Sequence, residues 1–199
     1  MKLPEPGIKG EVSLERTIRN RRTIRSFTSE GLTSEQFSQL LWAAQGITED
    51  RGGKRAAPSA GALYPMDIYA VVGAEGVQGL KAGVYHYEPR IHSVSLVSEG
   101  DLRNGVARAS LSQMWMARPP VNFVITAEYD RITAKYGKRG IRYAMIEAGH
   151  IGQNIFLQSE ALNLGAGIVG AFNDEEVIRV MKIPLSHEPL LIMPVGYKK

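Results

Sequence analysis

The chain has 199 residues, 44% of them hydrophobic, and a formal net charge of +4. This length and this balance predict one globular domain with a substantial core. The sequence contains no cysteine, which excludes disulfides, thiolate metal sites and thiol catalysis. Because no apolar run resembles a signal peptide or approaches membrane-spanning length, we expect a cytoplasmic protein with no membrane partner.

Lysine and arginine gather locally, at residues 19–25 and 135–142, rather than in one long stripe. Aromatic residues are not interleaved with them, as base-stacking platforms would require. We therefore expect no nucleic-acid partner. A basic surface of this kind suits anionic small ligands instead.

The N-terminal part of the chain combines one extended segment with two helices. Residues 1–11 hold two prolines and two glycines and are predicted to form an extended N-terminal arm, followed by one domain over residues 12–199. A short helix is predicted over residues 13–20. A second helix begins at the capping box Thr33-Ser34-Glu35-Gln36 and ends at Gly46.

The stretch that follows, residues 46–65, is rich in Gly, Ala and Pro and is predicted to be irregular, as long functional loops often are. Beyond it, apolar runs and helical spacing predict strands and helices in mixed order with several hairpin-like segments, which favours an α+β fold over a strict βαβ repeat. The longest helix has an apolar face of small residues, which suits the middle of a domain or a dimer interface. The predicted strands are 67–73, 83–87, 93–97, 121–127, 166–170 and 190–195, and the predicted helices are 99–110, 112–117, 141–163 and 174–182.

The arginine segment, residues 21–25, contains three guanidinium groups and one hydroxyl, on Arg21, Arg22, Thr23 and Arg25. Guanidinium groups bind phosphate oxygens in a bidentate way, and a nearby hydroxyl adds a donor. The segment is therefore predicted to form one wall of a phosphate pocket. The alternative is a solvated basic turn.

Two further segments could face a ligand. The Pro-Ser loop, residues 58–65, places small residues between two prolines, so that a flat ligand could lie against its backbone, and a tight surface turn is the alternative. The glycine segment, residues 165–172, offers backbone amides that could meet negative charge developing on a ring system. It does not match a dinucleotide fingerprint, because no Gly-x-Gly-x-x-Gly opens a helix after a first strand.

In this order and spacing, the three segments resemble the FMN-dependent nitroreductase superfamily. The resemblance is closest to its SagB-type dehydrogenase branch, which includes the azoline oxidases of ribosomal peptide maturation. It covers residues 18–196. Its most specific pieces are residues 21–25, 57–65, 83–87 and 147–154.

The resemblance implies a three-layer fold, in which a mostly antiparallel sheet of about four or five strands is flanked by helices. It also implies a homodimer that binds FMN at its interface. The arginine segment would hold the FMN phosphate and ribityl chain, the Pro-Ser loop would lie against the flavin, and amides of the glycine segment would face the flavin N5 and O4 edge. The residues that carry over are Arg21, Arg22, Thr23, Arg25, Pro58, Ser59, Ala60, Ala62, Leu63, Gly170 and Ala171, with Ala62 and Leu63 reaching the flavin from the other subunit.

The sequence departs from the family pattern at two places. Many nitroreductases carry an Asn and a Gln where this chain has Ala62 and Tyr64, which fits the SagB branch better. A basic C-terminal tail often reaches the phosphate in this family, and here the sequence ends with Lys198 and Lys199. Arg142 is a further candidate for the phosphate.

Lys135 and Tyr136 resemble the Lys-Tyr pair of the azoline oxidases, which removes a proton as hydride leaves for N5. This role needs a neutral lysine, which burial or nearby cationic groups would favour, and a basic surface is the alternative. No two histidines have metal-ligand spacing, so no metal is predicted. His150 is expected to be a hydrogen-bonded core or interface residue rather than a catalyst.

The sequence therefore predicts a homodimeric FMN-dependent oxidoreductase. Its flavin would be cycled by hydride transfer at N5, with NAD(P)H or a small organic substrate as the donor. Two alternatives remain at this point. One is a flavin-consuming enzyme of the same superfamily, and the other is a non-catalytic FMN- or nucleotide-binding module for sensing or storage.

Overall fold

The computed structural model describes residues 1–49 and 53–199. Its centre is a six-stranded sheet with the order β5-β4-β3-β6-β8-β7, in which every neighbouring pair is antiparallel. The α+β prediction is confirmed, and the sheet has the six strands predicted from the residues, against the four or five that the resemblance implied. The strand predicted over residues 166–170 is shorter, because β7 has only two residues. The strands are β3 (Met66–Val72), β4 (Gly83–Glu88), β5 (Ser93–Glu99), β6 (Val121–Ala127), β7 (Gly165–Ala166) and β8 (Glu188–Gly196).

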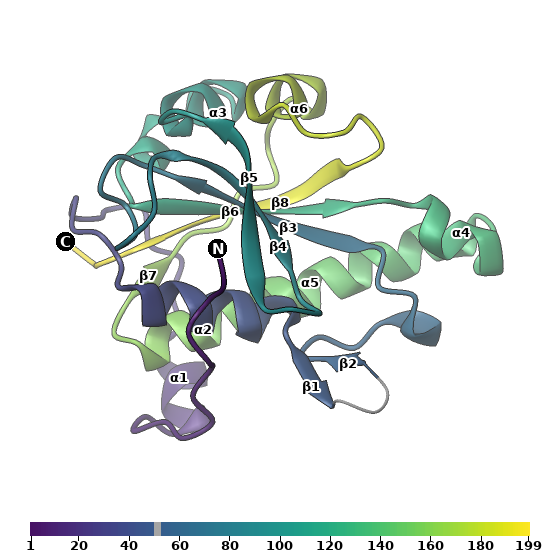
Figure 1. Ribbon diagram of the computed structural model, residues 1–199, viewed down its shortest axis with the longest axis horizontal. Coiled ribbons are helices and arrows are strands. Elements are labelled where there is room, and N and C mark those ends of the chain that lie inside the picture. The colour runs from purple at the N-terminus through teal and green to yellow at the C-terminus, as the bar shows by residue number, and fades with distance from the viewer. Residues whose placement is uncertain (50–52) are drawn as a thin grey trace.

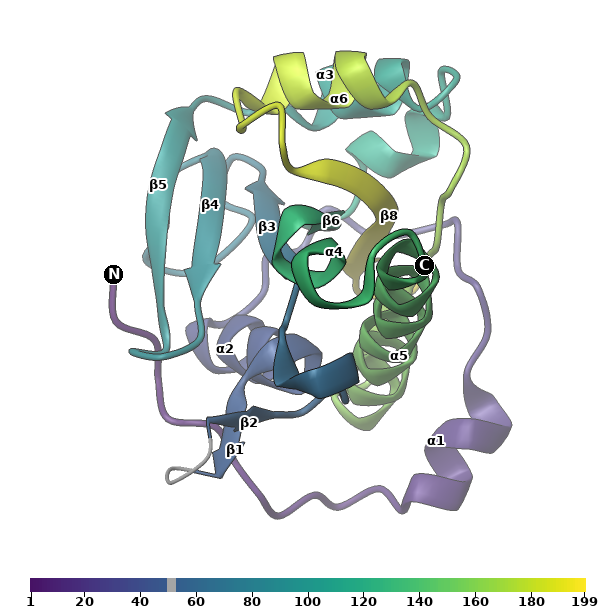
Figure 2. The ribbon, with the colours of Figure 1, turned by 90° about the vertical axis from the view of Figure 1, so that its right-hand side faces the viewer.

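Helices cover both faces of this sheet, which gives the predicted three layers (Figures 1 and 2). Helices α2 (Ser34–Gln45) and α5 (Arg139–Ala161) lie on one face. Helices α3 (Arg103–Ala109) and α6 (Asp174–Met181) lie on the other, near the 3-10 helix η2 (Met114–Ala117). The short helices α1 (Leu14–Asn20) and α4 (Asp130–Tyr136) lie toward opposite ends of α5 in Figure 1.

The central strands β3 and β6 are buried at every position because helices cover both faces. Successive side chains point to opposite faces, so Ile68 and Ala70 join the core under α2 and α5, whereas Tyr69 and Val71 join the core under α3 and α6. The sheet therefore separates two apolar cores, one on each of its faces.

Two predicted helix starts are confirmed at atomic detail. The Thr33 hydroxyl accepts a hydrogen bond from the Gln36 amide at 3.1 Å, and the Gln36 side chain accepts one from the Thr33 amide at 3.0 Å. The Ser13 hydroxyl accepts from the Arg16 amide at the start of α1. These contacts satisfy backbone donors that the first turn of a helix leaves unpaired.

The stretch over residues 46–65 is more regular than predicted. It contains the short hairpin strands β1 (Ile47–Glu49) and β2 (Lys54–Arg55) and the 3-10 helix η1 (Ala60–Ala62). Residues 50–52 of this stretch lie outside the described residues. Strands this short carry too few alternating residues for a pattern to reveal them.

Other boundaries also differ from the predictions. Helix α4 is missing from them because it has only seven residues, of which Ile132 alone is buried. Strand β5 runs on to Glu99, so the helix predicted from residue 99 begins only at Arg103. Within the described residues, none of the helices combines the length and the apolarity that crossing a lipid bilayer requires.

Candidate functional site

The structure gathers the predicted site residues into two groups, toward opposite ends of α5. The first group contains the arginine segment and the glycine segment, and Arg21 contacts Phe156 in the C-terminal half of the helix. The second contains the Pro-Ser loop with Lys135 and Tyr136, beside the N-terminal half. The two groups are therefore separated within one chain. Glu147, in the N-terminal half of α5, and Phe156, in the C-terminal half, are nine residues apart, which corresponds to about 14 Å along the helix.

In the first group, the arginine segment runs beside the edge strand β7. The Ile24 amide donates to the Ala166 carbonyl at 2.9 Å, and Thr23 and Ala166 form a parallel bridge. A Cβ atom on Gly167 would lie only 2.8 Å from the Trp115 ring and 2.9 Å from the Ile24 carbonyl oxygen. Glycine at this position therefore allows the two segments to approach closely.

The three guanidinium groups have different neighbours. The Cζ atom of Arg21 lies 5.0 Å from the centroid of the Phe156 ring, and that of Arg25 lies 6.0 Å from the Trp115 ring. Arg22 donates to the backbone carbonyls of Arg21 and Arg19, at 2.8 and 2.9 Å. Among the ion pairs of the described residues, none of these three arginines has a carboxylate partner. Arg21 and Arg25 therefore have charge available for an anion, whereas Arg22 is partly occupied.

The C-terminal tail also reaches the first group. Phe27 forms an antiparallel bridge with Lys198, and the Lys198 side chain lies beside Gly165 and Ile24. The Lys198 ammonium group pairs with Glu160 of α5 at 2.7 Å. The tail therefore lies beside the arginine segment, with the Lys198 charge already paired with a carboxylate.

At the far end of the glycine segment, Gly170 and Ala171 are exposed. No heavy atom lies within 4 Å of the place where a Cβ of Gly170 would be. Within the described residues, the backbone amides of both residues donate to no acceptor, and only the Ala171 carbonyl is engaged, by Gln113. Two adjacent, exposed amides of this kind can bind an electronegative edge of a ligand.

The Pro-Ser loop has an unusual backbone. Gly61, Ala62 and Tyr64 all have positive φ angles, of 64°, 53° and 48°. This region is costly for residues with a Cβ, by about 1 kcal/mol or more each. The Ser59 hydroxyl stabilises the loop by accepting from the Tyr64 amide at 2.9 Å, and the Arg55 guanidinium lies 4.3 Å from the Tyr64 ring centroid.

Helix α4 places Lys135 and Tyr136 directly beside this loop. A Cβ on Gly61 would lie 2.7 Å from the Tyr136 hydroxyl and 3.1 Å from Lys135 Nζ. Pro58 and Ala62 are exposed on the loop, while Ala60 and Leu63 pack partly against the core. Lys135 itself is exposed, so this chain does not provide the burial considered above for a neutral lysine. The side chains of Lys135 and Tyr136 and the Pro-Ser loop therefore lie side by side on the surface of the protein.

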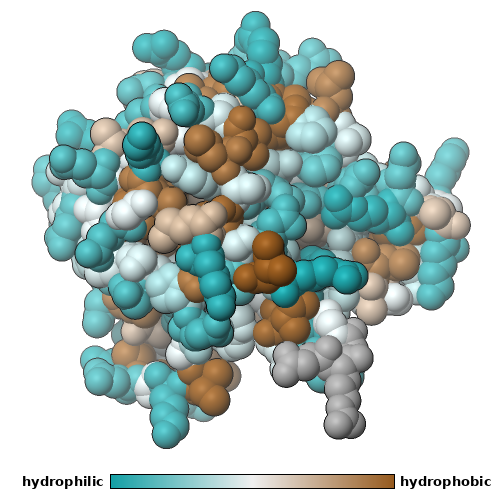
Figure 3. Space-filling view, viewed as in Figure 1, coloured by the Kyte–Doolittle hydropathy of each residue, from teal (hydrophilic) through white to brown (hydrophobic). Residues whose placement is uncertain are grey.

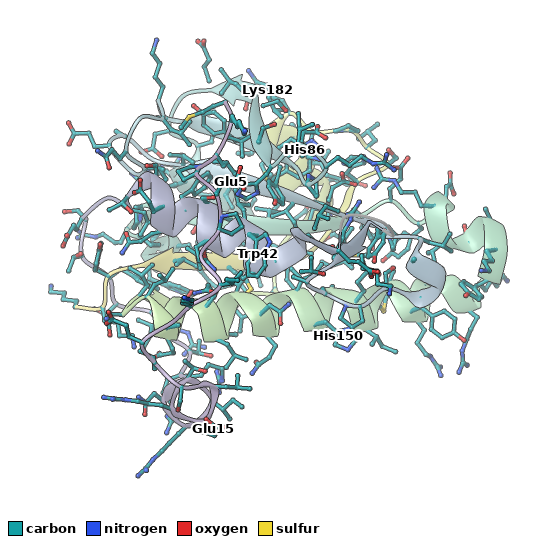
Figure 4. The ribbon with its side chains drawn as sticks, turned by 60° about the horizontal axis from the view of Figure 1, so that its bottom comes forward. Glu5, Glu15, Trp42, His86, His150 and Lys182 are labelled. Atoms are coloured by element: carbon teal, nitrogen blue, oxygen red, sulfur yellow. The ribbon has the colours of Figure 1, made fainter. Side chains whose placement is uncertain are left out.

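Arg142 and His150 lie on the exposed side of α5. Arg142 is near the N-terminal end of the helix, with the second group, so it is remote along this chain from the arginine segment. His150 is exposed and projects away from the sheet (Figure 4). Of the two positions expected for His150, the core is wrong, because the buried face of α5 is formed by other residues. The interface position stays a prediction.

A buried carboxyl group was missed by the sequence predictions. Glu147 is 1% exposed and accepts a hydrogen bond from the Gln45 amide nitrogen at 2.9 Å. Burial raises the pKa of Glu147 to about 7, although hydrogen bonds from Ser59 and Gln45 and the charge of Arg55 oppose the shift. Its position among the apolar residues of a helix face is a signal that could have drawn attention to it.

A polar cluster lies on strands β3 and β4. His86 bonds to Asp67 at 2.8 Å and to Glu88 at 2.9 Å, and Arg131 pairs with Asp67 at 2.7 Å. Burial alone would raise the pKa of Asp67, but the His86 hydrogen bond and the Arg131 charge hold it below its usual value. His86 belongs to strand β4 and is labelled in Figure 4.

This cluster also contains a set of potential metal ligands. One ligand atom each from Asp67, Glu128 and His187 lies within 4.8 Å of the others. The Arg131 guanidinium pairs with both carboxylates and so already supplies the cation there. The geometry is that of a charge-compensated network rather than a site that needs an ion.

A cleft of about 770 Å³ opens beside the Pro-Ser loop, lined by Trp42, Arg55, Ala62, Tyr64 and Arg90 among others. A smaller cavity of about 220 Å³ is lined by Gln45, Arg55, Asp67, His86 and Arg131. The surface seen in Figure 3 is mostly hydrophilic, with apolar residues in small separate groups.

Comparison with known proteins adds to this geometry. The sequence profile of the nitroreductase family matches residues 18–197. The chain is 42% identical over 198 residues to a Methanocaldococcus jannaschii protein provisionally named nitroreductase MJ1384, covering 100% of this chain and 97% of that protein. It is 26% identical over 157 residues to the microcin B17-processing protein McbC of Escherichia coli, covering 76% of this chain and 57% of McbC. A crystal structure from Ralstonia eutropha JMP134, also provisionally named a nitroreductase, gives a TM-score of 0.85 at 27% identity, covering 100% of this chain and 89% of that one.

Proposed function

Because this chain belongs to the nitroreductase family, whose profile spans residues 18–197, we propose that it is an FMN-dependent oxidoreductase. The resemblance predicted from the sequence is confirmed, and the relation to McbC agrees with the SagB-type branch. The observation that carries the proposal is the pairing of the arginine segment with the glycine segment through Ile24 and Ala166. This pairing joins the segment of Arg21 and Arg25, which have no carboxylate partner among the described residues, to the segment that carries the backbone amides of Gly170 and Ala171.

The residues of the first group fit a flavin mononucleotide. Arg21 and Arg25 can neutralise a phosphate because no carboxylate among the described residues pairs with them. The open space at Gly170 and the unpaired amides of Gly170 and Ala171 can receive the polar edge of a flat ring. Both features suit a ligand with an anionic end and an aromatic end.

Bound FMN would supply the redox chemistry, by accepting a hydride at N5 from NAD(P)H or an organic substrate and giving it to an acceptor. The chain would supply position and charge. Pro58, Ser59 and Ala60 would lie against the ring, and the amides of Gly170 and Ala171 would donate to its electronegative edge. Where an organic substrate is the hydride donor, Lys135 with Tyr136 would take the proton that this substrate loses.

We further propose that the functional unit is a homodimer formed through α5. Ile141, Met145 and Ile146 form an apolar face on this helix and are 37%, 53% and 50% exposed. Gly149 continues the face with no heavy atom within 4 Å of its Cβ position. Two copies packed antiparallel through these faces would bring the first group of one copy toward the second group of the other, and would so complete the site.

Substituting Ile146→Glu should convert the dimer to a monomer, because a charge would be buried in an apolar interface. Sedimentation equilibrium would measure the mass. Leu185→Glu is the matched control, since Leu185 is 85% exposed on a loop remote from α5 and its substitution should leave the mass unchanged. A dimeric mass for the Ile146 variant would refute this interface.

Substituting Lys135→Ala should slow the reduction of bound flavin by a proton-losing organic substrate by about tenfold. This is below the usual range for a general base, because Lys135 is exposed in this chain. Stopped-flow absorbance at the flavin band measures the rate, and reduction by NAD(P)H should be unaffected because it needs no base. An unchanged rate of flavin reduction by the organic substrate would show that Lys135 does not act as the base.

The function itself is tested on the purified protein. We expect a yellow protein that oxidises NADH or NADPH, or reduces its flavin with an organic substrate, at rates that depend on the acceptor. A protein that binds FMN but turns over slowly with every donor and acceptor would instead be a sensor or storage module. A colourless protein that binds no added FMN would refute the proposal.

A further inference from the structure

The buried side chains of Gln45 and Glu147 leave two polar atoms without partners. Gln45 is fully buried on α2, and Glu147 faces it from α5. The Gln45 nitrogen donates to Glu147 Oε1 at 2.9 Å. The other oxygen of each side chain, Gln45 Oε1 and Glu147 Oε2, has no hydrogen-bond partner in the described residues. Buried polar atoms are normally satisfied, so this pair needs an explanation.

One proton on Glu147 would satisfy both atoms. A carboxylic acid has one O–H donor, and a side-chain amide has one carbonyl acceptor. The O–H on Oε2 would donate to Gln45 Oε1 while the Gln45 nitrogen donates to Oε1, which gives a two-hydrogen-bond pair. An ionised carboxylate would instead place two acceptors face to face in a buried position.

The charge nearest Glu147 favours its ionised form, but it makes no ion pair with the carboxyl group in the described part of the chain, so burial outweighs it. Arg55, on β2, is the one charged side chain that acts appreciably on the carboxyl group, and no ion pair joins the two within the described residues. The Arg55 guanidinium lies over the Tyr64 ring instead. Gln45 on α2 and Ser59 in the Pro-Ser loop, the other groups that face the carboxyl, carry no charge.

The same carboxyl group is connected to the strained loop. The Ser59 hydroxyl lies close enough to Glu147 to lower its pKa as a hydrogen-bond donor. The Ser59 oxygen also accepts from the Tyr64 amide at 2.9 Å, and Tyr64 is one of the loop residues with a positive φ. A chain of contacts thus runs from Gln45 through Glu147 and Ser59 to the loop backbone.

We propose that Glu147 is a positioning residue that carries a proton: its neutral carboxyl group pairs with Gln45 and holds the Pro-Ser loop through Ser59. The proton resides on Oε2 and is not transferred to a ligand. This role concerns the chain alone and does not depend on the flavin. When the proton is lost, the Ser59 hydroxyl donates more strongly to the carboxylate, but the paired acceptors of Glu147 and Gln45 repel each other and water must enter between them. We expect the second effect to be larger, so the loop should become less protected.

Two measurements on the full-length, flavin-free protein test this assignment. Difference infrared spectroscopy between pH 6 and pH 8 should show the carbonyl stretch of a protonated carboxyl group, and Glu147→Gln should abolish that signal. Hydrogen exchange should show protection of the loop amides falling more than about threefold in the wild type over the same pH change, after correction for intrinsic rates. The Glu147→Gln variant should keep the low-pH protection at both pH values, because glutamine can make the same two hydrogen bonds.

Ser59→Ala separates the carboxyl group from the loop. It should keep the infrared signal and lower loop protection about tenfold at both pH values, because the Tyr64 amide loses its acceptor. Glu30→Gln, at an exposed glutamate, is the matched control and should change neither measurement. The proposal is overturned if Glu147→Gln leaves the infrared signal intact, or if Ser59→Ala leaves loop protection intact. A protein that passes both tests but binds no FMN would refute only the proposed function.

Discussion

Replacing both Arg21 and Arg25 with alanine should lower the affinity of the protein for FMN by about 10² to 10⁴-fold. Each guanidinium is expected to make a charge-assisted hydrogen bond to the phosphate, and such bonds contribute about 1.5–3 kcal/mol each. Neither arginine pairs with a carboxylate in the described residues, so no internal ion pair would be broken by the change. Titration of the apoprotein with FMN, followed by quenching of flavin fluorescence, measures the dissociation constant.

Arg22→Ala provides an internal control for this experiment. Its guanidinium already donates to the carbonyls of Arg19 and Arg21, so its loss should weaken FMN binding less than loss of Arg21 or Arg25. Arg108→Ala, on the outer side of α3, should have no effect. If the double variant retains its flavin, the phosphate is bound elsewhere and the arginine segment is a solvated basic turn.

Substituting Glu147→Gln should stabilise the protein relative to the wild type at pH 8 and leave it nearly unchanged at pH 4.5. Burial raises the pKa of Glu147 from 4.5 to about 7, so between these values the folded state binds more protons than the unfolded state. The free energy of unfolding of the wild type therefore falls as the pH rises through this window, by on the order of 3 kcal/mol in total, and is level above it. Glutamine does not titrate and avoids this loss.

Thermal denaturation of both proteins across pH 4.5 to 8 measures the difference, with Glu30→Gln as the exposed control. The two melting temperatures should diverge as the pH rises and stay apart above pH 7. If the curves of melting temperature against pH were parallel for the two proteins, the pKa of Glu147 would be the same in the folded and unfolded states. That result would also contradict the neutral acid pair with Gln45.

Much of the fold could be predicted because the relevant signals are local. The apolar runs of β3 and β6 identified buried strands, and the Thr33 capping box gave the start of α2 to the residue. Helix α4 was missed because it has no side-chain cap at its start and only one buried residue, Ile132. The bounds of β7 were misplaced because two residues carry almost no periodicity. Their positions are decided by packing against α5 and by pairing with β8.

The candidate site was predictable in composition but not in arrangement. The arginine segment and the Pro-Ser loop could be recognised by residue type, yet the pairing of Ile24 with Ala166 joins residues far apart in the sequence. The cluster of Asp67, His86 and Arg131 likewise depends on strand register, which no local pattern specifies. The burial of Glu147 depends on Gln45 facing it from another helix.

The left-handed backbone of the Pro-Ser loop constrains how this protein can diversify. A saturation library at Ala62, where φ is 53°, should yield folded variants enriched in Asn, Asp and Gly and depleted in Val, Ile and Thr, since β-branched side chains disfavour that conformation. Asparagine, which many nitroreductases carry at this place, is among the residues that adopt it most readily. Exchange of alanine for asparagine should therefore lower the strain of the main chain, so the residue at this position can change while the loop keeps its backbone shape.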